Sequence, residues 1–429
     1  MNRQPRTVII GLDGMPYGLM DTFGRDGTMP NFGALTEESV FCPLASSIPE
    51  VSSVAWSSVI TGQNPGEHGI YGFIDIAPGT YRRIFPNFSN LKAPTFWERD
   101  GDRRAVILNV PTTYPARELN GVLVAGFVAL DLERATYPRS LVPTLQELAY
   151  KVDVDAQKAH QSLDFFLRDL TKTLDARIAA YRHLWETVDW DTFMLVFTGT
   201  DRLAHFLWDA YEDPNHRFYD AFRDHFKAID GVIGEIAAQL DPQDALLMLS
   251  DHGFERLDQN VYLNRVLQDA GFLQFEEGAR PSLKAVGAEA RAFALEPSRI
   301  YLNAQERFPR GSVAAPDRKP LLDDITALIE TLTYDGEPVI QRVYHRDELY
   351  HGPHIDRAPD LVLLGNPGYN LRASWRASDT FGTDVFSGKH SQGDAFLLVR
   401  GENAGDAVPA KPSVADVVGI MDNLQQTHT

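Results

Sequence analysis

Residues 7–18 read TVIIGLDGMPYG, in which a run of β-forming residues ends in Gly11, Leu12 and Asp13. Such an apolar run is typical of a strand buried on both faces of a parallel sheet. The acidic residue at its end admits three interpretations: a glycine loop that holds phosphate, a plain turn, or a carboxylate that binds a cation. The glycines are spaced G-x-x-G-x-x-x-G, and no Lys-Ser or Lys-Thr pair follows them. This spacing argues against the phosphate loop and leaves the turn and the cation site open.

Short apolar runs of the same kind recur along the chain, and amphipathic segments separate them. Leu163–Trp185 and Phe222–Leu240 carry apolar residues at three- and four-residue spacing, which predicts helices. The alternation of strands and helices predicts an α/β fold with a mostly parallel central sheet flanked by helices on both faces. The predicted buried strands are Val8–Leu12, Ala105–Val110, Val122–Ala125, Thr192–Phe197, Ala245–Leu249, Asp360–Leu364 and Ala395–Val399.

One stretch, residues 274–337, breaks this regular pattern. It contains EEGARPSLKAVGAEARAF and ERFPRGSVAAPDRKP, which are dense in Gly, Pro and charged residues. We interpret this stretch as a small cap inserted beside the sheet. The predicted organisation is therefore an α/β core formed by residues 4–273 and 338–425, with the cap insertion at 274–337.

The composition argues against several classes of partner. The 429 residues carry a formal net charge of −19 without any basic block, so binding to a nucleic acid polymer is not expected. An anionic substrate would need local help, such as bound cations. Cys42 is the one cysteine, which excludes a disulfide framework and a Cys-rich zinc site within the chain. No secretory signal and no apolar run of about 18 residues is found, which predicts a cytoplasmic protein without a membrane partner.

Polar residues collect where the predicted strands end. Ligands of open α/β sheets bind beyond the carboxyl ends of the strands, so residues at these ends are candidates for a site. Imidazole and carboxylate groups without thiolate suit Zn²⁺ or Mn²⁺. Each residue alone also has a plain interpretation, as part of a turn, a surface pair or a helix cap. The candidate metal ligands are Asp13, Asp201, His205, Asp251, His252 and His390.

Ser52 is the candidate nucleophile. It lies in PEVSSVAWSSVITGQNPGEHGIYGF, residues 49–73, at the point where an apolar helix is predicted to begin. The ordinary interpretation of a serine at such a position is an N-cap. The alternative is that a bound cation activates the hydroxyl while backbone N–H groups of the first helical turn face phosphoryl oxygens. The residues by themselves leave both interpretations open.

Taken in order, these stretches resemble the alkaline phosphatase superfamily, in its type I phosphodiesterase / nucleotide pyrophosphatase branch. The resemblance implies an alkaline phosphatase-like fold and a small-molecule phosphate ester as substrate. It also implies two divalent metal ions, with Zn²⁺ favoured over Mn²⁺, and a covalent phosphoseryl intermediate. The segments that carry it are VIIGLDGM, PEVSSVAWSSVITGQNPGEHGIYGF, VILNVPTTYPARELNGVLVAGF, FTGTDRLAHFLWDAY, LLMLSDHGF, YHGPHIDRAPDLVLL and GKHSQGDAFLLVRG.

The resemblance also implies how the ligands divide between the two ions. A pair of ions of this kind clamps the attacking and leaving oxygens of an in-line displacement. One ion would be held by Asp201, His205 and His390, and the other by Asp13, Asp251 and His252, with Ser52 completing it.

Two positions depart from the pattern of the branch. Ser52 stands where the branch usually carries Thr, and serine is chemically competent as a nucleophile. Phe73 stands where the nucleotide pyrophosphatases place an Asn that holds a phosphate oxygen. The expected function is a metal-dependent phosphodiesterase or phosphohydrolase. The alternatives are a phosphomutase of the same superfamily and a non-catalytic metal-binding scaffold.

Residues beside the candidates allow more than one interpretation. Val54–Trp56 follow the serine where the phosphomonoesterase branch keeps an Arg. They form either an apolar wall for the second organic group of a diester or the buried face of the helix. Arg202 and Lys389 flank predicted ligands, and they either screen acidic repulsion or face solvent. His68 is predicted to be structural, bonding the last carbonyls of a helix.

Overall fold

The computed structural model describes residues 5–426, which form two compact units. Unit 1 comprises the residues up to Gln63, Asn87–Glu255 and the residues from Val385 onward. Unit 2 comprises Asn64–Pro86 and Arg256–Asp384. The stretch 274–337 lies within unit 2, and its role as a cap on a core formed by 4–273 and 338–425 remains a prediction.

Among residues 5–426, eight strands form the central sheet of unit 1. Five adjacent strands from β9 to β6 run parallel, and antiparallel strands lie outside them on both sides. The predicted mostly parallel sheet is thereby confirmed. In order across the sheet, the strands are β2 (Val40–Leu44), β21 (Ala395–Arg400), β9 (Ala245–Leu249), β1 (Thr7–Leu12), β8 (Thr192–Phe197), β5 (Ala105–Leu108), β6 (Gly121–Val124) and β7 (Thr136–Tyr137).

The register brings the carboxyl ends of three parallel strands to one edge of the sheet. Leu12, the last residue of β1, pairs with Phe197, the last residue of β8. Gly11 pairs with Leu249, the last residue of β9. The residues that follow these strands therefore leave the sheet side by side, where ligands bind in open α/β folds.

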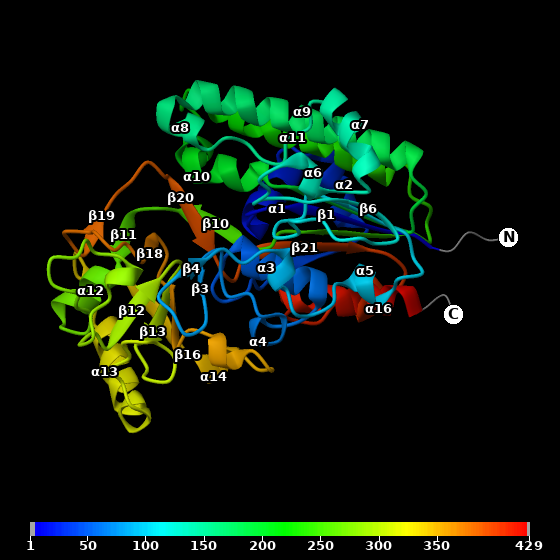
Figure 1. The fold of residues 1–429 in the computed structure, drawn as a ribbon. Coiled ribbons are helices and arrows are strands. Elements are labelled where there is room, and N and C mark those ends of the chain that lie inside the picture. Colours follow the sequence, from blue (N-terminus) through cyan, green and yellow to red (C-terminus); the bar gives the residue numbers. More distant parts are fainter. Residues whose placement is uncertain (1–4, 427–429) are drawn as a thin grey trace. The chain divides into compact units, whose positions relative to one another are not determined.

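Helices cover both faces of the sheet, as predicted. Figure 1 shows α9, α10 and α11 on one face and α3 and α16 on the other. The predicted helices 163–185 and 222–240 correspond to α9 (Leu163–Thr187) and α11 (Tyr219–Ala237). The other helices of unit 1 are α1 (Tyr17–Arg25), α2 (Pro30–Glu37), α3 (Ser52–Thr61), α5 (Phe96–Arg99), α6 (Leu132–Ala135), α7 (Val142–Glu147), α8 (Gln157–Gln161), α10 (Gly199–Glu212), α15 (Ala404–Ala407) and α16 (Val417–Gln426).

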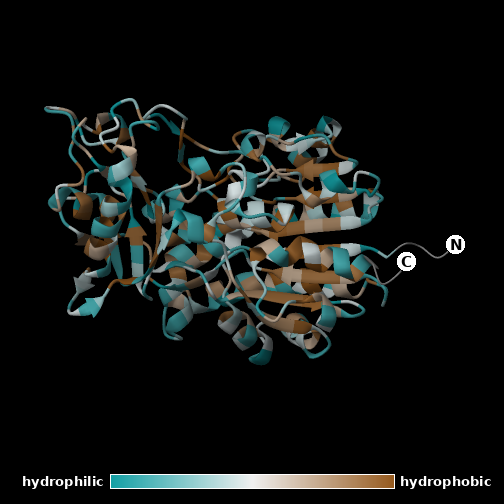
Figure 2. Cartoon of the chain, turned by 90° about the horizontal axis from the view of Figure 1, so that it is seen from below, coloured by the Kyte–Doolittle hydropathy of each residue, from teal (hydrophilic) through white to brown (hydrophobic). Residues whose placement is uncertain are grey.

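The core of unit 1 lies where these helices meet the strands. Val8, Ile10 and Leu12 of β1 are fully buried and belong to the same apolar cluster as Phe193 of β8 and Phe226 of α11. Figure 2 shows the strands of this sheet as mostly apolar ribbons. Strands buried on both faces need apolar residues at every position, which is why they read as continuous runs in the sequence.

Gly11 in β1 is required by the packing of α3 against the sheet. A Cβ atom at this position would lie 2.4 Å from Cη2 of Trp56 and 3.0 Å from a methyl group of Val196. Gly11→Ala is therefore expected to lower the free energy of unfolding by about 1–3 kcal/mol, the usual cost of overpacking a core. Gly18→Ala in α1 is the matched control, because nothing lies within 4 Å of its Cβ position. Thermal unfolding of both variants tests this. A Tm of Gly11→Ala equal to that of the natural protein would contradict it.

Unit 2 is built from shorter strands and has its own apolar core. In the described part of this unit, an antiparallel sheet runs in the order β12 (Ala292–Leu295), β13 (Arg299–Leu302), β17 (Leu361–Gly365) and β16 (Ile340–His345). The remaining strands are β11 (Gln259–Tyr262), β18 (Tyr369–Arg372), β19 (Phe381–Gly382), β3 (Asp75–Ile76), β4 (Arg83–Ile84), β14 (Thr333–Tyr334) and β15 (Glu337–Pro338). Its helices are α4 (Pro65–His68), α12 (Leu263–Asp269), α13 (Arg318–Glu330) and α14 (Arg346–Leu349).

One predicted strand lies in a different sheet from the one expected. Asp360–Leu364 corresponds to β17, which pairs antiparallel with β13 and β16 in unit 2. A short buried run has the same composition in either kind of sheet, so composition alone does not assign it. Within residues 5–426, the structure holds no helix with the length and apolar character needed to cross a membrane.

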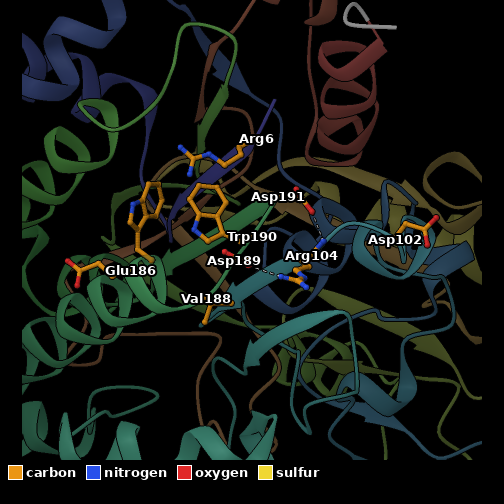
Figure 3. A pocket seen from close by; sticks show the side chains of 9 residues that line it. Arg6, Asp102, Arg104, Glu186, Val188, Asp189, Trp190 and Asp191 are labelled. Atoms are coloured by element: carbon orange, nitrogen blue, oxygen red, sulfur yellow. Dashed lines mark hydrogen bonds and ion pairs between the residues drawn. The ribbon is translucent and has the colours of Figure 1, made fainter. Parts of the chain in front are cut away.

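A polar hollow of about 450 Å³ lies at the amino ends of the parallel strands, opposite the ends where the candidate ligands follow (Figure 3). Arg6, Arg104 and Asp191, which directly precede β1, β5 and β8, help to line it. The guanidinium of Arg6 covers the Trp190 ring at 4.4 Å, and Arg104 pairs with Asp189 at 3.0 Å. Arg6, Arg104 and Asp189 are thus engaged with neighbours, and the candidate ligands lie at the carboxyl ends of the strands.

Candidate active site

Asp13 and Asp251 lie together where β1 and β9 end. The backbone N–H of Gly14 donates to Asp251 Oδ1 at 3.2 Å, which ties the two strand ends to each other. Gly14 has φ +72°, and a Cβ there would crowd Phe254, Asp201 and His252 at 3.1–3.2 Å. The predicted turn after β1 is therefore confirmed, and it brings the Asp13 carboxylate beside that of Asp251.

Asp201 and His205 come from the first two turns of α10. Their four-residue spacing puts both on one face of the helix, with Asp201 Oδ1 3.4 Å from His205 Nε2. His390 reaches the same place from β20 (Gly388–Ser391). Its Nε2 atom lies 3.1 Å from Asp201 Oδ1 and 3.0 Å from His205 Nε2.

Ser52 is the first residue of α3, and its hydroxyl is directed at the other cluster. Oγ lies 3.3 Å from Asp13 Oδ1 and 3.2 Å from His252 Nε2. The N-cap of α3 is Val51, whose side chain makes no capping hydrogen bond. Interpreting Ser52 as an ordinary N-cap is therefore wrong.

The predicted ligands form one continuous cluster within unit 1. Among the described residues, two sets of side chains each bring their ligand atoms within 4.8 Å of one another: Asp13, Asp251 and His252, and Asp201, His252 and His390. The rings of His252 and His390 stack at 3.7 Å and join the two sets. His205 adds a further imidazole beside the second set, at the distances given above.

The imidazoles are oriented as metal ligands usually are. In each ring Nδ1 lies at hydrogen-bonding distance from a backbone carbonyl: Gly388 for His205, Gly253 for His252 and Glu50 for His390. If Nδ1 donates in each case, the lone pair of Nε2 faces the cluster. Facing lone pairs repel one another unless a proton or a cation lies between them. The donor set therefore fits divalent cations.

Each carboxylate has one oxygen held by a donor and the other turned toward the cluster. Trp56 Nε1 donates to Asp13 Oδ2 at 3.2 Å, and Arg202 Nη1 donates to Asp201 Oδ2 at 3.1 Å. Asp251 accepts from Gly14 at Oδ1, whereas its buried Oδ2 has no hydrogen-bond partner among the described residues. A buried, unsatisfied carboxylate oxygen is costly, so this atom also fits a cation.

The electrostatics of the protein without ions are correspondingly unfavourable. Burial and the charges of Asp251 and Asp201 raise the pKa of Asp13 well above its usual range. Burial raises the pKa of Asp251 to about 7 and lowers the pKa of His205 to about 4. Burial also opposes the charge of Asp201, but His205, His390 and Arg202 outweigh it and lower its pKa. Cations would relieve these costs, so ion binding is expected to release protons.

The hydrogen bond from Trp56 to Asp13 was not predicted from the sequence, which offered Trp56 only as part of an apolar wall or of a buried helix face. Trp56 follows Ser52 by four residues, which puts both on one face of α3 and could have served as the signal. Val54, Ala55 and Trp56 are all fully buried. All ten residues of α3 are buried, so these three do not form an exposed apolar wall.

Arg202 and Lys389 both make ion pairs. Lys389 Nζ lies 2.5 Å from Glu255 Oε1, and its side chain is mostly buried. Arg202 contacts Asp201 and also binds Asp153 at 2.9 Å, while its guanidinium stacks over Phe127 at 4.2 Å. Because its donors are engaged on both sides, Arg202 is placed to orient Asp201.

We expect Arg202→Met to weaken Zn²⁺ binding and turnover by about 10–100-fold, the usual effect of removing a group that orients a metal ligand. Arg182→Met is the matched control, because Arg182 forms an exposed ion pair with Glu235. Chelator competition measures the affinity without requiring activity. Equal affinities in the two variants would show that Arg202 does not orient the site.

His68 lies in unit 2, and its predicted structural role rests on its burial. It is fully buried, and its Nδ1 accepts from the N–H of Ile70 at 3.2 Å, so this contact is not one with a helix carbonyl. Burial lowers its pKa to about 3. The site residues named above all belong to unit 1, whereas Phe73 belongs to unit 2.

The lowered pKa of His68 predicts a loss of stability in acid. The unfolded chain takes up a proton near pH 6.5 but the folded chain does not, so stability is fully present above that pH and falls as the pH drops toward 3. Between pH 8 and pH 5 this histidine should lower the free energy of unfolding by about 2 kcal/mol. Urea unfolding of His68→Gln, which retains an acceptor and does not titrate, should show a pH dependence flatter by that amount. An unchanged pH dependence would contradict this account.

The model of the family described as type I phosphodiesterase / nucleotide pyrophosphatase matches residues 7–392 of the chain. The chain belongs to this family. The resemblance stated from the sequence is thereby confirmed, and the protein is assigned to the hydrolases of phosphoric esters. No curated protein matches the chain.

Solved structures share its fold at low sequence identity. The phosphonoacetate hydrolase of Sinorhizobium meliloti 1021, in complex with phosphonoformate, has a TM-score of 0.64 at 18% identity, covering 98% of this chain and 95% of that one. Murine ectonucleotide pyrophosphatase/phosphodiesterase 5 has a TM-score of 0.55 at 13% identity, with the same coverage. An inactive form of the murine protein in complex with AMP also has a TM-score of 0.55 at 13% identity, covering 99% and 95%. These likenesses confirm the alkaline phosphatase-like fold.

Proposed function

We propose that this protein is a metal-dependent phosphodiesterase in which Ser52 is the nucleophile and forms a covalent phosphoseryl intermediate. The observation that carries the proposal is the position of the Ser52 hydroxyl, within 3.3 Å of both Asp13 and His252. A capping serine would instead bond to backbone N–H groups of its own helix. A hydroxyl held between a carboxylate and an imidazole at a helix N-terminus suits attack on phosphorus.

The donor set supports two divalent ions, with Zn²⁺ favoured and Mn²⁺ the alternative. Such ions, when bound, would neutralise charge on the phosphoryl oxygens and lower the pKa of the serine hydroxyl. Asp201, His205 and His390 would hold one ion, and Asp13, Ser52, Asp251 and His252 would hold the other.

The reaction would proceed in two displacements at phosphorus. Ser52 Oγ attacks, the Oγ–P bond forms, and the bond from phosphorus to the leaving oxygen breaks. The leaving alcohol receives a proton in place of the one that the serine loses. Water then attacks the phosphoseryl group, the Oγ–P bond breaks, and a phosphate monoester leaves as the serine regains its proton. The N–H of Ser53, in the first turn of α3, would donate to a phosphoryl oxygen in both steps.

The substrate would be a small phosphate ester with two organic groups. The family description names phosphodiesterases and nucleotide pyrophosphatases. Two proteins of similar fold hold small ligands of related chemistry, phosphonoformate in one and AMP in the other. Phe73 in place of an Asn supports a diester substrate other than a nucleotide pyrophosphate.

Hydrolysis of two chromogenic esters tests this proposal. The protein loaded with Zn²⁺ or Mn²⁺ should hydrolyse bis-p-nitrophenyl phosphate faster than p-nitrophenyl phosphate, and removal of the ions should abolish turnover. Hydrolysis of the monoester alone would contradict the diesterase assignment. Isomerisation of a phosphosugar without hydrolysis would indicate a mutase. Tight ion binding without any turnover would indicate a non-catalytic scaffold.

A further inference from the structure

A small cavity lies behind the first turn of α10, on the side of α9 and α11. Arg177 of α9 and His225 of α11 line it, together with Thr198 and Gly199 at the start of α10. Both Arg177 and His225 are more than nine-tenths buried. The cavity belongs to unit 1 and contains none of the candidate metal ligands.

Two polar atoms of these side chains lack partners. Arg177 Nε and His225 Nε2 are buried, and none of the described residues supplies a hydrogen-bond partner to either. Three hydrogen bonds of Arg177 go to neutral acceptors, namely Thr198 Oγ1 at 3.1 Å, the Val152 carbonyl at 2.6 Å and the Lys151 carbonyl at 3.4 Å. Unsatisfied buried groups of this kind each cost free energy, so two beside one cavity point to a shared ligand.

The size and charge of the cavity select the ligand. The space open to the centre of a water molecule is about 10 Å³, close to the minimum that one buried water requires. Arg177 Nε can only donate a hydrogen bond, whereas a neutral imidazole nitrogen can accept one. Burial and the nearby Arg177 lower the pKa of His225 to about 3, which keeps the ring neutral. Asp153 also lines the cavity, and its negative charge disfavours an anion.

We propose that one buried water molecule occupies this cavity, accepts a hydrogen bond from Arg177 Nε and donates one to His225 Nε2, and thereby fixes the start of α10. The contacts of both side chains with α10 support this role. Arg177 holds Thr198 directly, and a Cβ at Gly199 would lie 3.1 Å from His225 Nε2. Asp201 follows Gly199 by two residues, so Arg177 and His225 would be positioning residues for Asp201. The positioning role rests on the proposed function of Asp201 as a metal ligand, whereas the water site does not depend on it.

A high-resolution crystal structure of the full chain, soaked in bromide, tests the water site. We expect a density peak without bromine anomalous signal about 3 Å from both Arg177 Nε and His225 Nε2. A bromine peak at this position would show an anion site and overturn the proposal. The absence of any peak, with the two atoms bonded elsewhere, would also overturn it.

Variants test the positioning role without requiring turnover. Arg177→Met should raise the Zn²⁺ dissociation constant about tenfold in chelator competition, the lower end for groups that orient metal ligands. Arg177→Lys keeps the charge but lacks Nε–H, so it should weaken binding in the same direction and serves if the Met variant fails to fold. Arg182→Met, on the exposed side of α9, is the control. A lower Tm with Zn²⁺ affinity equal to that of the control would show a merely structural role and overturn the positioning claim.

Discussion

Ser52→Ala is expected to reduce hydrolysis of bis-p-nitrophenyl phosphate by about 10⁴-fold or more, as loss of a nucleophile does in serine hydrolases. The hydroxyl is the group that would form the bond to phosphorus, and it lies at hydrogen-bonding distance from Asp13 and His252 of the cluster. Zn²⁺ binding should persist in this variant, because the carboxylates and imidazoles remain. Steady-state kinetics with the Zn²⁺-loaded variant measure the effect.

Ser57→Ala is the matched control, because Ser57 lies in the same helix and is equally buried. Its hydroxyl donates to the Ser53 carbonyl at 2.7 Å and takes no part in the cluster. This control should keep turnover within a few-fold of the natural protein. If Ser52→Ala also kept its turnover, Ser52 would not be the nucleophile, whatever the state of the metal site.

His252→Ala is expected to have the second-largest effect. His252 belongs to both sets of candidate ligands, and its ring stacks on His390. Losing it should weaken Zn²⁺ binding by more than about 100-fold and lower turnover by about 10³-fold, which corresponds to about 4 kcal/mol of transition-state stabilisation. Titration calorimetry gives the affinity and number of bound ions, and the diester assay gives the turnover.

The control for this variant is His351→Ala. The His351 side chain is 77% exposed and lies 3.7 Å from a carboxylate oxygen of Glu67. Its loss should therefore change neither Zn²⁺ binding nor turnover of the diester. Unchanged ion stoichiometry in His252→Ala would contradict the assignment of His252 as a ligand. A loss of turnover with full ion binding would instead limit His252 to a contact with Ser52.

Much of the fold could be predicted because the strands of a doubly covered sheet are continuous apolar runs. The predicted runs Val8–Leu12 and Thr192–Phe197 are both strands of the central sheet, with the predicted bounds to within one residue. Composition failed for Asp360–Leu364, which is equally apolar but lies in the antiparallel sheet of unit 2. Nothing in a five-residue run distinguishes the two environments.

The candidate ligands could be found because the carboxyl ends of parallel strands share one edge. The structure brings Asp13, Asp201 and Asp251 together from positions far apart in the sequence. The contacts that orient them could not be predicted, because they depend on packing between elements. Trp56 reaches Asp13 only because α3 packs on the sheet at Gly11, where no Cβ interferes.

The most direct test of the central claim is a crystal structure of the Zn²⁺-loaded protein with vanadate, with data collected at the zinc absorption edge. The account predicts two zinc peaks among the Asp and His residues of the cluster, with vanadium bonded to Ser52 Oγ. Zinc peaks elsewhere, or vanadate bound away from Ser52, would contradict it.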